Sequence, residues 1–209
     1  MKKVIIFDFD GTIANTMDVA DLIYMKISNS FGFKKFTQKE INELKHLSIH
    51  DRMKKHSLSI FQLPKLVRKI RKILVELIDQ APIFEGMKPL LEDLSRSGYT
   101  LAILSSNSKE NIMHFVNKHE IDVFEYICGG AAFFGKEQKL KKLIRKFKVN
   151  KEEVIYVGDE VRDILSCKSF GIDIVAISYG FDDKDILKVA EPTYLAGNIM
   201  ELRNILESR

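Results

Sequence analysis

The chain has 209 residues, of which 45% are hydrophobic and 30% charged, and its formal net charge is +4. This length and apolar content are enough to bury a full core, and the absence of low-complexity tracts and solenoid repeats argues against disordered and repeat architectures. The apolar runs are about strand length, far short of the roughly 20 residues of a membrane-spanning helix. We therefore expect a globular protein in the cytoplasm, built from one domain or from one domain with a modest insertion.

The first predicted element is a buried strand in "VIIFDFDGT" that ends in two acids, Asp8 and Asp10. Strand signals are then missing from residue 15 to residue 83. Helices are predicted there from Thr16 to Phe31, from the capping-box stretch "TQKE", and after Pro64, where apolar residues recur at helical spacing. The stretch is expected to be an inserted helical cap.

From residue 84 onward, predicted helices and strands alternate. Helices over 87–97, from 109 onward, over 136–147 and up to Gly171 are interleaved with the apolar segments "YTLAIL", "YICGG", "EVIYVGD" and "IDIVAIS". Such alternation is typical of a parallel sheet covered by helices on both faces. The predicted fold is therefore α/β, with a Rossmann-like core at residues 1–14 and 84–209 and an inserted α-helical cap at residues 15–83.

Polar side chains follow several of these strands. In parallel α/β sheets, ligands bind beyond the carboxyl ends of the strands, so these residues are the candidates for a site. They are Asp8 and Asp10 after the first strand, Ser105, Ser106 and Asn107 after "LAIL", Lys136 at the start of a helix, and Asp159 after "VIYVG".

The chemistry of this set points to phosphoryl transfer. Asp8 and Asp10 point to the same side of a strand, and their crowded carboxylates would be stabilised by Mg²⁺, which prefers oxygen ligands. Proximity to a second carboxylate can raise the pKa of one acid, so that it can donate a proton and later accept one. The Lys136 ammonium and a serine hydroxyl supply donors for phosphate oxygens.

Four motifs in this order resemble those of the haloacid dehalogenase-like phosphatase superfamily. They are "DFDGT", "ILSSN", "FGKEQKL" and "GDEVRD". The resemblance covers nearly the whole chain and is closest to the phosphoglycolate phosphatase-like members, which carry a small helical cap after the first motif. It implies a Mg²⁺-dependent phosphatase that acts on a small phosphate monoester, possibly phosphoglycolate, through an aspartyl-phosphate.

The resemblance also implies roles for residues of the first motif. Asp8 would be the nucleophile and a metal ligand. Asp10 would protonate the leaving group, later activate water, and bind Mg²⁺ through its carbonyl oxygen. Thr12 would support the site.

Roles for the remaining motifs follow in the same way. Ser106, Asn107 and Lys136 would hold the phosphoryl group, and the choice between Ser105 and Ser106 stays open. Asp159 would complete the metal site, supported by Asp163. In the cap, "LKHLSIHDR" is similar to a segment that contacts substrate in relatives, which makes Lys45, Ser48, His50 and Arg52 candidate substrate residues.

Other functions remain to be weighed. A dehalogenase of the same superfamily would not be expected to carry the second acid, whereas a phosphomutase related to β-phosphoglucomutase shares the core motifs. A non-enzymatic protein that binds anions or nucleic acid is suggested by residues 34–72, which hold twelve Lys or Arg against three Asp or Glu. Aromatic residues are few there, so an anion-attracting cap is the better interpretation.

The expected partner is thus a small phosphorylated metabolite, without nucleic acid or membrane. The sequence leaves the natural substrate open, and it does not distinguish a monomer from a homodimer.

Overall fold

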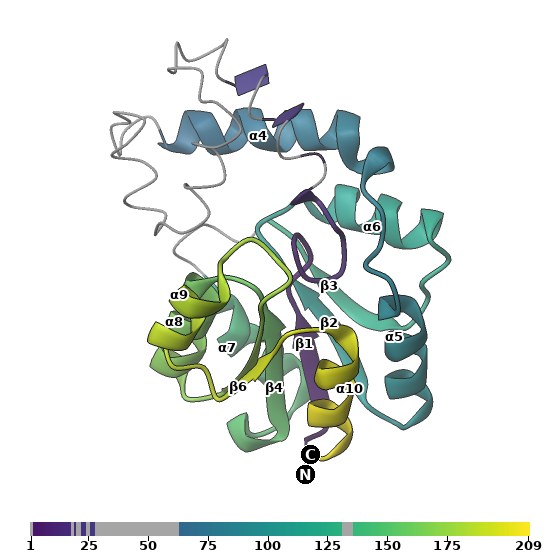
Figure 1. Ribbon diagram of the computed structural model, residues 1–209. Helices are drawn as coiled ribbons and strands as arrows, with labels where there is room; N and C mark the ends of the chain where they lie inside the picture. The colour runs from purple at the N-terminus through teal and green to yellow at the C-terminus, as the bar shows by residue number, and fades with distance from the viewer. Residues whose placement is uncertain (1, 18, 20–21, 24–25, 28–62, 131–135) are drawn as a thin grey trace.

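The computed structural model describes residues 2–17, 19, 22–23, 26–27, 63–130 and 136–209 (Figure 1). A six-stranded sheet runs through the centre in the order β3-β2-β1-β4-β5-β6, and every pairing is parallel. Its strands are β1 (Val4–Phe7), β2 (Thr100–Leu104), β3 (Phe124–Cys128), β4 (Val154–Gly158), β5 (Asp173–Ile177) and β6 (Tyr194–Ala196).

Helices cover both faces of this sheet. The helices of the core are α5 (Met87–Arg96), α6 (Lys109–Lys118), α7 (Lys136–Phe147), α8 (Val161–Phe170), α9 (Lys184–Val189) and α10 (Ile199–Glu207), with a short 3-10 turn, η3 (Lys151–Glu153). Apolar residues of α5, α6 and α10 pack on one face and those of α7, α8 and α9 on the other. The predicted α/β fold, with helices on both faces of a parallel sheet, is confirmed.

β1 shows why the central strands are apolar along their whole length. Ile5 and Phe7 pack into the core on the α5 side, while Val4 and Ile6 pack into the core on the α7 side. Side chains alternate across a strand, so a strand buried on both faces needs an apolar residue at every position. The first residues free to be polar are those after Phe7, and they lie at the carboxyl edge of the sheet.

The described part of the predicted cap includes helix α4 (Leu63–Leu77), the 3-10 turn η2 (Ile78–Gln80) and residues 15–17, 19, 22–23 and 26–27, most of which are helical. Val19, Ile23 and Ile27 from that first stretch pack with α4. Leu66, Ile70, Ile73 and Leu77 recur at helical spacing and pack into an apolar cluster separate from the two core clusters. Figure 1 shows α4 beyond the end of the sheet at which β1 ends. The division into core and cap at residues 15–83 stays a prediction.

Two linkers join this region to the core side by side. Asn15 N–H donates to Pro82 O at 2.8 Å and Phe84 N–H donates to Ile13 O at 3.2 Å, with an antiparallel bridge between Ala14 and Ile83. Both linkers therefore leave the core next to the residues that follow β1.

Among the described residues, no helix is long and apolar enough to cross a membrane.

Candidate active site

The sheet delivers its polar residues to one edge. Asp8 N–H donates to Val157 O at 2.8 Å, which extends the pairing of β1 with β4 by one residue and fixes the Asp8 side chain beside the end of β4. Asp8 is 2% exposed and Asp159 is fully buried. The polar groups predicted from the strand ends thus lie close together, as the topology requires.

Lys136 links two of the acids. This lysine is the first residue of α7 and is 5% exposed, and its Nζ donates to Asp8 Oδ2 and to Asp163 Oδ1. Burial by itself would lower the pKa of Lys136, but the carboxylates of Asp163 and Asp8 outweigh burial and raise it. The ammonium is therefore charged at every physiological pH and compensates the negative charge beside it.

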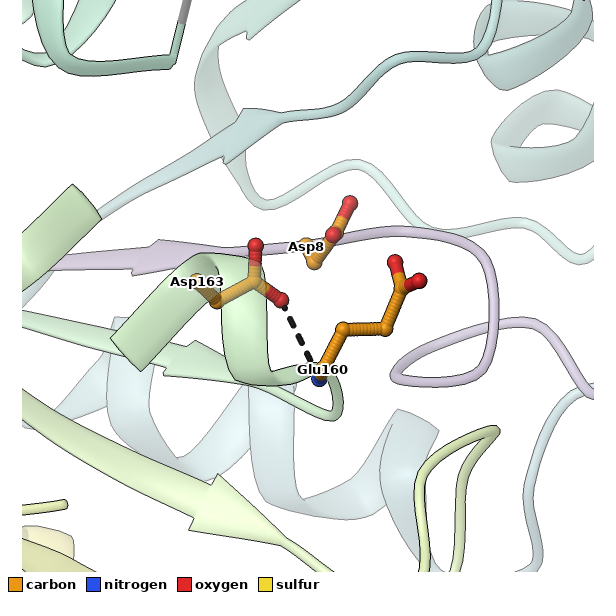
Figure 2. A group of neighbouring side chains, drawn as sticks. All are labelled: Asp8, Glu160 and Asp163. Atoms are coloured by element: carbon orange, nitrogen blue, oxygen red, sulfur yellow. Dashed lines mark hydrogen bonds between the residues drawn. The ribbon is translucent and has the colours of Figure 1, made fainter. Parts of the chain in front are cut away.

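Three carboxylates form a cluster around this position (Figure 2). Oxygen atoms of Asp8, Glu160 and Asp163 lie within 4.8 Å of one another. Asp163 lies in the first turn of α8, and its Oδ2 accepts from the Glu160 N–H at 3.4 Å, drawn as the dashed line in Figure 2. Burial, with a contribution from Asp8, raises the pKa of Asp163 to about 7, although Lys136 acts in the opposite direction. Burial therefore keeps Asp163 partly protonated near neutral pH even with Lys136 present.

Glu160 was not among the predicted site residues. The sequence indicates it only by its place in "GDEVRD", where it follows Gly158, the last residue of β4, and Asp159. The guanidinium of Arg162 pairs with the Glu160 carboxylate, with Nε donating to Oε2 at 2.7 Å. Arg162 is therefore a second cation at this edge that the sequence analysis did not single out.

Asp159 has a different environment from the cluster. Its Oδ1 accepts from the Thr12 hydroxyl at 2.9 Å and its Oδ2 from the Phe181 N–H at 2.8 Å. The packing around it is tight, since a Cβ added to Gly11 would lie 2.2 Å from Asp159 Oδ2 and one added to Gly180 would lie 2.3 Å from Asp159 Cβ. Burial raises the pKa of Asp159 well above its usual value. Through these bonds Asp159 connects Thr12, in the loop after β1, to Phe181, in the loop after β5.

The Asp10 carboxylate accepts a hydrogen bond from a neutral side-chain amide. Asn107 Nδ2 donates to Asp10 Oδ1 at 3.1 Å. Burial and the nearby Asp8 carboxylate raise the pKa of Asp10 to about 7. A carboxyl group with this pKa is half protonated near neutral pH, so it can both give and accept a proton.

The two candidate serines differ in exposure. Ser105 is fully buried and its Oγ accepts from the Asn107 N–H at 3.1 Å, while Ser106 is partly exposed. The candidate cap residues Lys45, Ser48, His50 and Arg52 lie outside the described residues.

Comparison with known proteins places the chain in a family. Residues 5–177 match the family model described as "Haloacid dehalogenase-like hydrolase". The chain belongs to this family. The resemblance predicted from its four motifs is therefore confirmed.

Relatives and solved structures agree with this assignment. The chain is 29% identical to a phosphoglycolate phosphatase of Synechococcus elongatus over 92% of both chains, and 24% identical to one of Vibrio vulnificus over 98% of this chain and 96% of the relative. A haloacid dehalogenase-like family hydrolase of Streptococcus pneumoniae superposes with a TM-score of 0.81 at 23% identity, covering 100% of this chain and 99% of that one. The predicted enzyme class, a hydrolase of the phosphatase type, is confirmed.

Proposed function

We propose that the protein is a Mg²⁺-dependent phosphatase that hydrolyses a small phosphate monoester through an aspartyl-phosphate on Asp8. The observation that carries the proposal is the position of Asp8. Its carboxylate accepts from the buried Lys136 ammonium and has oxygens of Glu160 and Asp163 within 4.8 Å, while Asp10, with a pKa near 7, follows two residues later. A nucleophile, a cation for phosphate oxygens and a proton donor are thus brought together.

The donor set suits a divalent cation. The cluster of Asp8, Glu160 and Asp163 offers hard carboxylate oxygens, which Mg²⁺ prefers. Burial, and after it the neighbouring Asp8 and Glu160 carboxylates, raise the pKa of Asp163, and a bound cation would favour its ionised form. The proposed ligands are the Asp8 carboxylate and the Asp10 carbonyl oxygen. Asp159 and Glu160 are rival candidates for a second carboxylate ligand. A bound Mg²⁺ would neutralise charge on the transferring phosphoryl group.

The proposed reaction has two steps. An Asp8 carboxylate oxygen attacks phosphorus, the ester P–O bond breaks, and Asp10 gives its proton to the leaving oxygen. Asp10 then takes a proton from a water molecule, whose oxygen attacks the same phosphorus and releases phosphate and Asp8. Two easier displacements replace one difficult displacement, which lowers the barrier. In both steps Lys136, the Ser106 hydroxyl and the Asn107 amide would hold the phosphoryl oxygens.

For the substrate, we propose a small phosphorylated metabolite. The names of the relatives favour phosphoglycolate. A phosphomutase would use the same acids, but it would return the phosphoryl group to a sugar phosphate rather than to water.

The test is release of inorganic phosphate from phosphoglycolate, from a panel of sugar phosphates and from an aryl phosphate, each with Mg²⁺ and with a chelator. We expect Mg²⁺-dependent release that Asp8→Asn lowers by at least about 10³-fold with the fold intact, since the amide is nearly isosteric but a poor nucleophile. Substantial turnover by Asp8→Asn would exclude the aspartyl-phosphate. Isomerisation of a sugar phosphate without phosphate release would show a mutase.

A further inference from the structure

A chain of side-chain amides runs from helix α6 to Asp10. Asn111 Nδ2 donates to Asn107 Oδ1 at 3.0 Å, and Asn107 Nδ2 donates in turn to Asp10 Oδ1 at 3.1 Å. Both asparagines are buried, with Asn111 4% and Asn107 2% exposed. The recorded hydrogen bonds of Asn111 go to Asn107 and Ser108 and not to the acids or the lysine of the proposed reaction, so Asn107 is its recorded link to Asp10.

The orientation of the Asn107 amide is fixed by its partners. The Ser108 backbone N–H donates to Asn107 Oδ1 at 2.8 Å. Because a backbone N–H can only donate, the oxygen of the Asn107 amide must face Ser108, and its NH₂ must face Asp10. Asn111 adds a second donor to the same oxygen. Reversal of the Asn107 amide would give up both bonds and turn its oxygen toward the Asp10 carboxylate.

Helix formation does not account for the Asn111 side chain. α6 is already capped by Ser108, whose Oγ accepts from the Asn111 backbone N–H at 3.2 Å. Any residue at position 111 could supply that N–H, whereas the bond to Asn107 needs a side-chain donor of this length. A buried amide that is not needed for the cap is therefore used to hold another amide.

We propose that Asn111 is a positioning residue for the phosphatase reaction, which holds the Asn107 NH₂ toward Asp10 and so keeps the Asp10 carboxyl aimed at the leaving group. This inference rests on the proposed function in one respect, the role of Asp10. The orientation of Asn107 itself does not depend on it.

Asn111→Asp is the sharpest variant. It is nearly isosteric, and an acid in the first turn suits the helix dipole, so α6 should survive. It replaces one of the two donors to Asn107 Oδ1 by an oxygen that repels it, which leaves the Asn107 amide held by the Ser108 N–H alone and displaces it. The matched control is Asn117→Asp, the same substitution at an exposed position of the same helix. Assays at about pH 8 keep the new carboxylate ionised.

The kinetic test compares two leaving groups. A general acid matters most for a poor leaving group, so Asn111→Asp should lower kcat for an alkyl phosphate by about tenfold, with less loss for an aryl phosphate and KM little changed. In an Asn107→Ala background the same substitution should have no further effect, because its path to Asp10 is gone. Equal losses on both substrates, or an effect that persists without Asn107, would overturn the proposal.

A second readout does not require activity. In ¹H–¹⁵N spectra the side-chain NH₂ pair of Asn107, identified by its loss in Asn107→Ala, should shift in Asn111→Asp and stay in place in Asn117→Asp. An unmoved pair would overturn the proposal even if kcat fell. If the wild-type protein released no phosphate from any ester, the proposed function would fail, while the spectra would still decide whether Asn111 holds Asn107.

Discussion

The carboxylates of the active edge fall into two groups that differ in how their charge is compensated. Asp8 and Asp163 share the buried ammonium of Lys136, whereas Asp10 and Asp159 are bonded by neutral donors, an amide for one and a hydroxyl and a backbone N–H for the other. Buried carboxylates with and without a cationic partner are therefore suited to different roles. The first group concentrates charge where we propose that a phosphoryl group is held, and the second contains the proposed proton donor, Asp10, and Asp159, which joins two loops.

Removal of the shared cation should have the largest effect. Lys136→Met leaves Asp8 and Asp163 without their ammonium, and breaking a buried pair in this way costs about 3–5 kcal/mol. We expect a large fall in the unfolding temperature and loss of phosphatase activity. The control is Lys142→Met, at an exposed position of the same helix. Stability and turnover near those of the wild type would show that the two acids need no cation.

The next prediction concerns Mg²⁺ binding and tests whether Glu160 or Asp159 is the metal ligand. Glu160 belongs to the oxygen cluster, while both oxygens of Asp159 already accept hydrogen bonds. We expect Glu160→Gln to raise the Mg²⁺ concentration for half-maximal activity by about 10- to 100-fold. Asp159→Asn should leave the Mg²⁺ requirement nearly unchanged, because the amide can keep both bonds, its oxygen accepting from the Phe181 N–H and its NH₂ donating to the Thr12 hydroxyl. The opposite result in Mg²⁺ titrations would identify Asp159 as the ligand, as the motif predicts.

Stability of the metal-free protein should fall as pH rises. The pKa values of Asp10 and Asp163 are raised from 3.8 to about 7. Between these values the folded state keeps protons that the unfolded state has released, so the contribution of these two groups to the free energy of unfolding decreases with pH and levels off above about 7. The raised pKa of Asp159 acts in the same direction. With a chelator present, we expect the unfolding temperature at about pH 8 to be several degrees lower than at about pH 5.5.

Two comparisons test the source of this pH dependence. Mg²⁺ should reduce it by compensating the ionised acids, and Asp10→Asn should reduce it by removing one titrating group. A free energy of unfolding that rises over the same range in the chelated protein would contradict the raised pKa values.

The smallest effect on stability should come from loss of the hydrogen bond between the Thr12 hydroxyl and Asp159. Thr12→Val keeps the shape of the side chain but leaves Asp159 Oδ1 without its hydroxyl donor, which should cost about 1 kcal/mol of stability. Because Thr12 contacts neither Asp8 nor Lys136 by a hydrogen bond that the structure records, kcat should stay close to that of the wild type. Denaturant unfolding and steady-state kinetics measure the two quantities, and a larger loss of kcat than of stability would move Thr12 into the catalytic group.

Much of the fold was predictable because its signals are local. α7 begins at Lys136 and ends at Phe147 as its pattern predicts, and β1 ends where the apolar run meets Asp8. In the predicted cap, α4 begins next to Pro64 at Leu63. These boundaries depend on side-chain periodicity and on the residues that start or stop an element, which a single sequence contains.

The sequence by itself determined the order of the strands and helices along the chain. It also predicted that Asp8, Asp10, Lys136 and Asp159 lie at one edge of the sheet, since parallel strands end on the same side. Only the tertiary structure decided the partners of these residues. That Lys136 pairs with Asp163, that Glu160 joins the cluster and that Asn111 holds Asn107 depend on the register between strands and on how the loops close over them. Hydrogen bonds and charge interactions act over a few ångströms, so their pattern is set by packing rather than by any spacing along the chain.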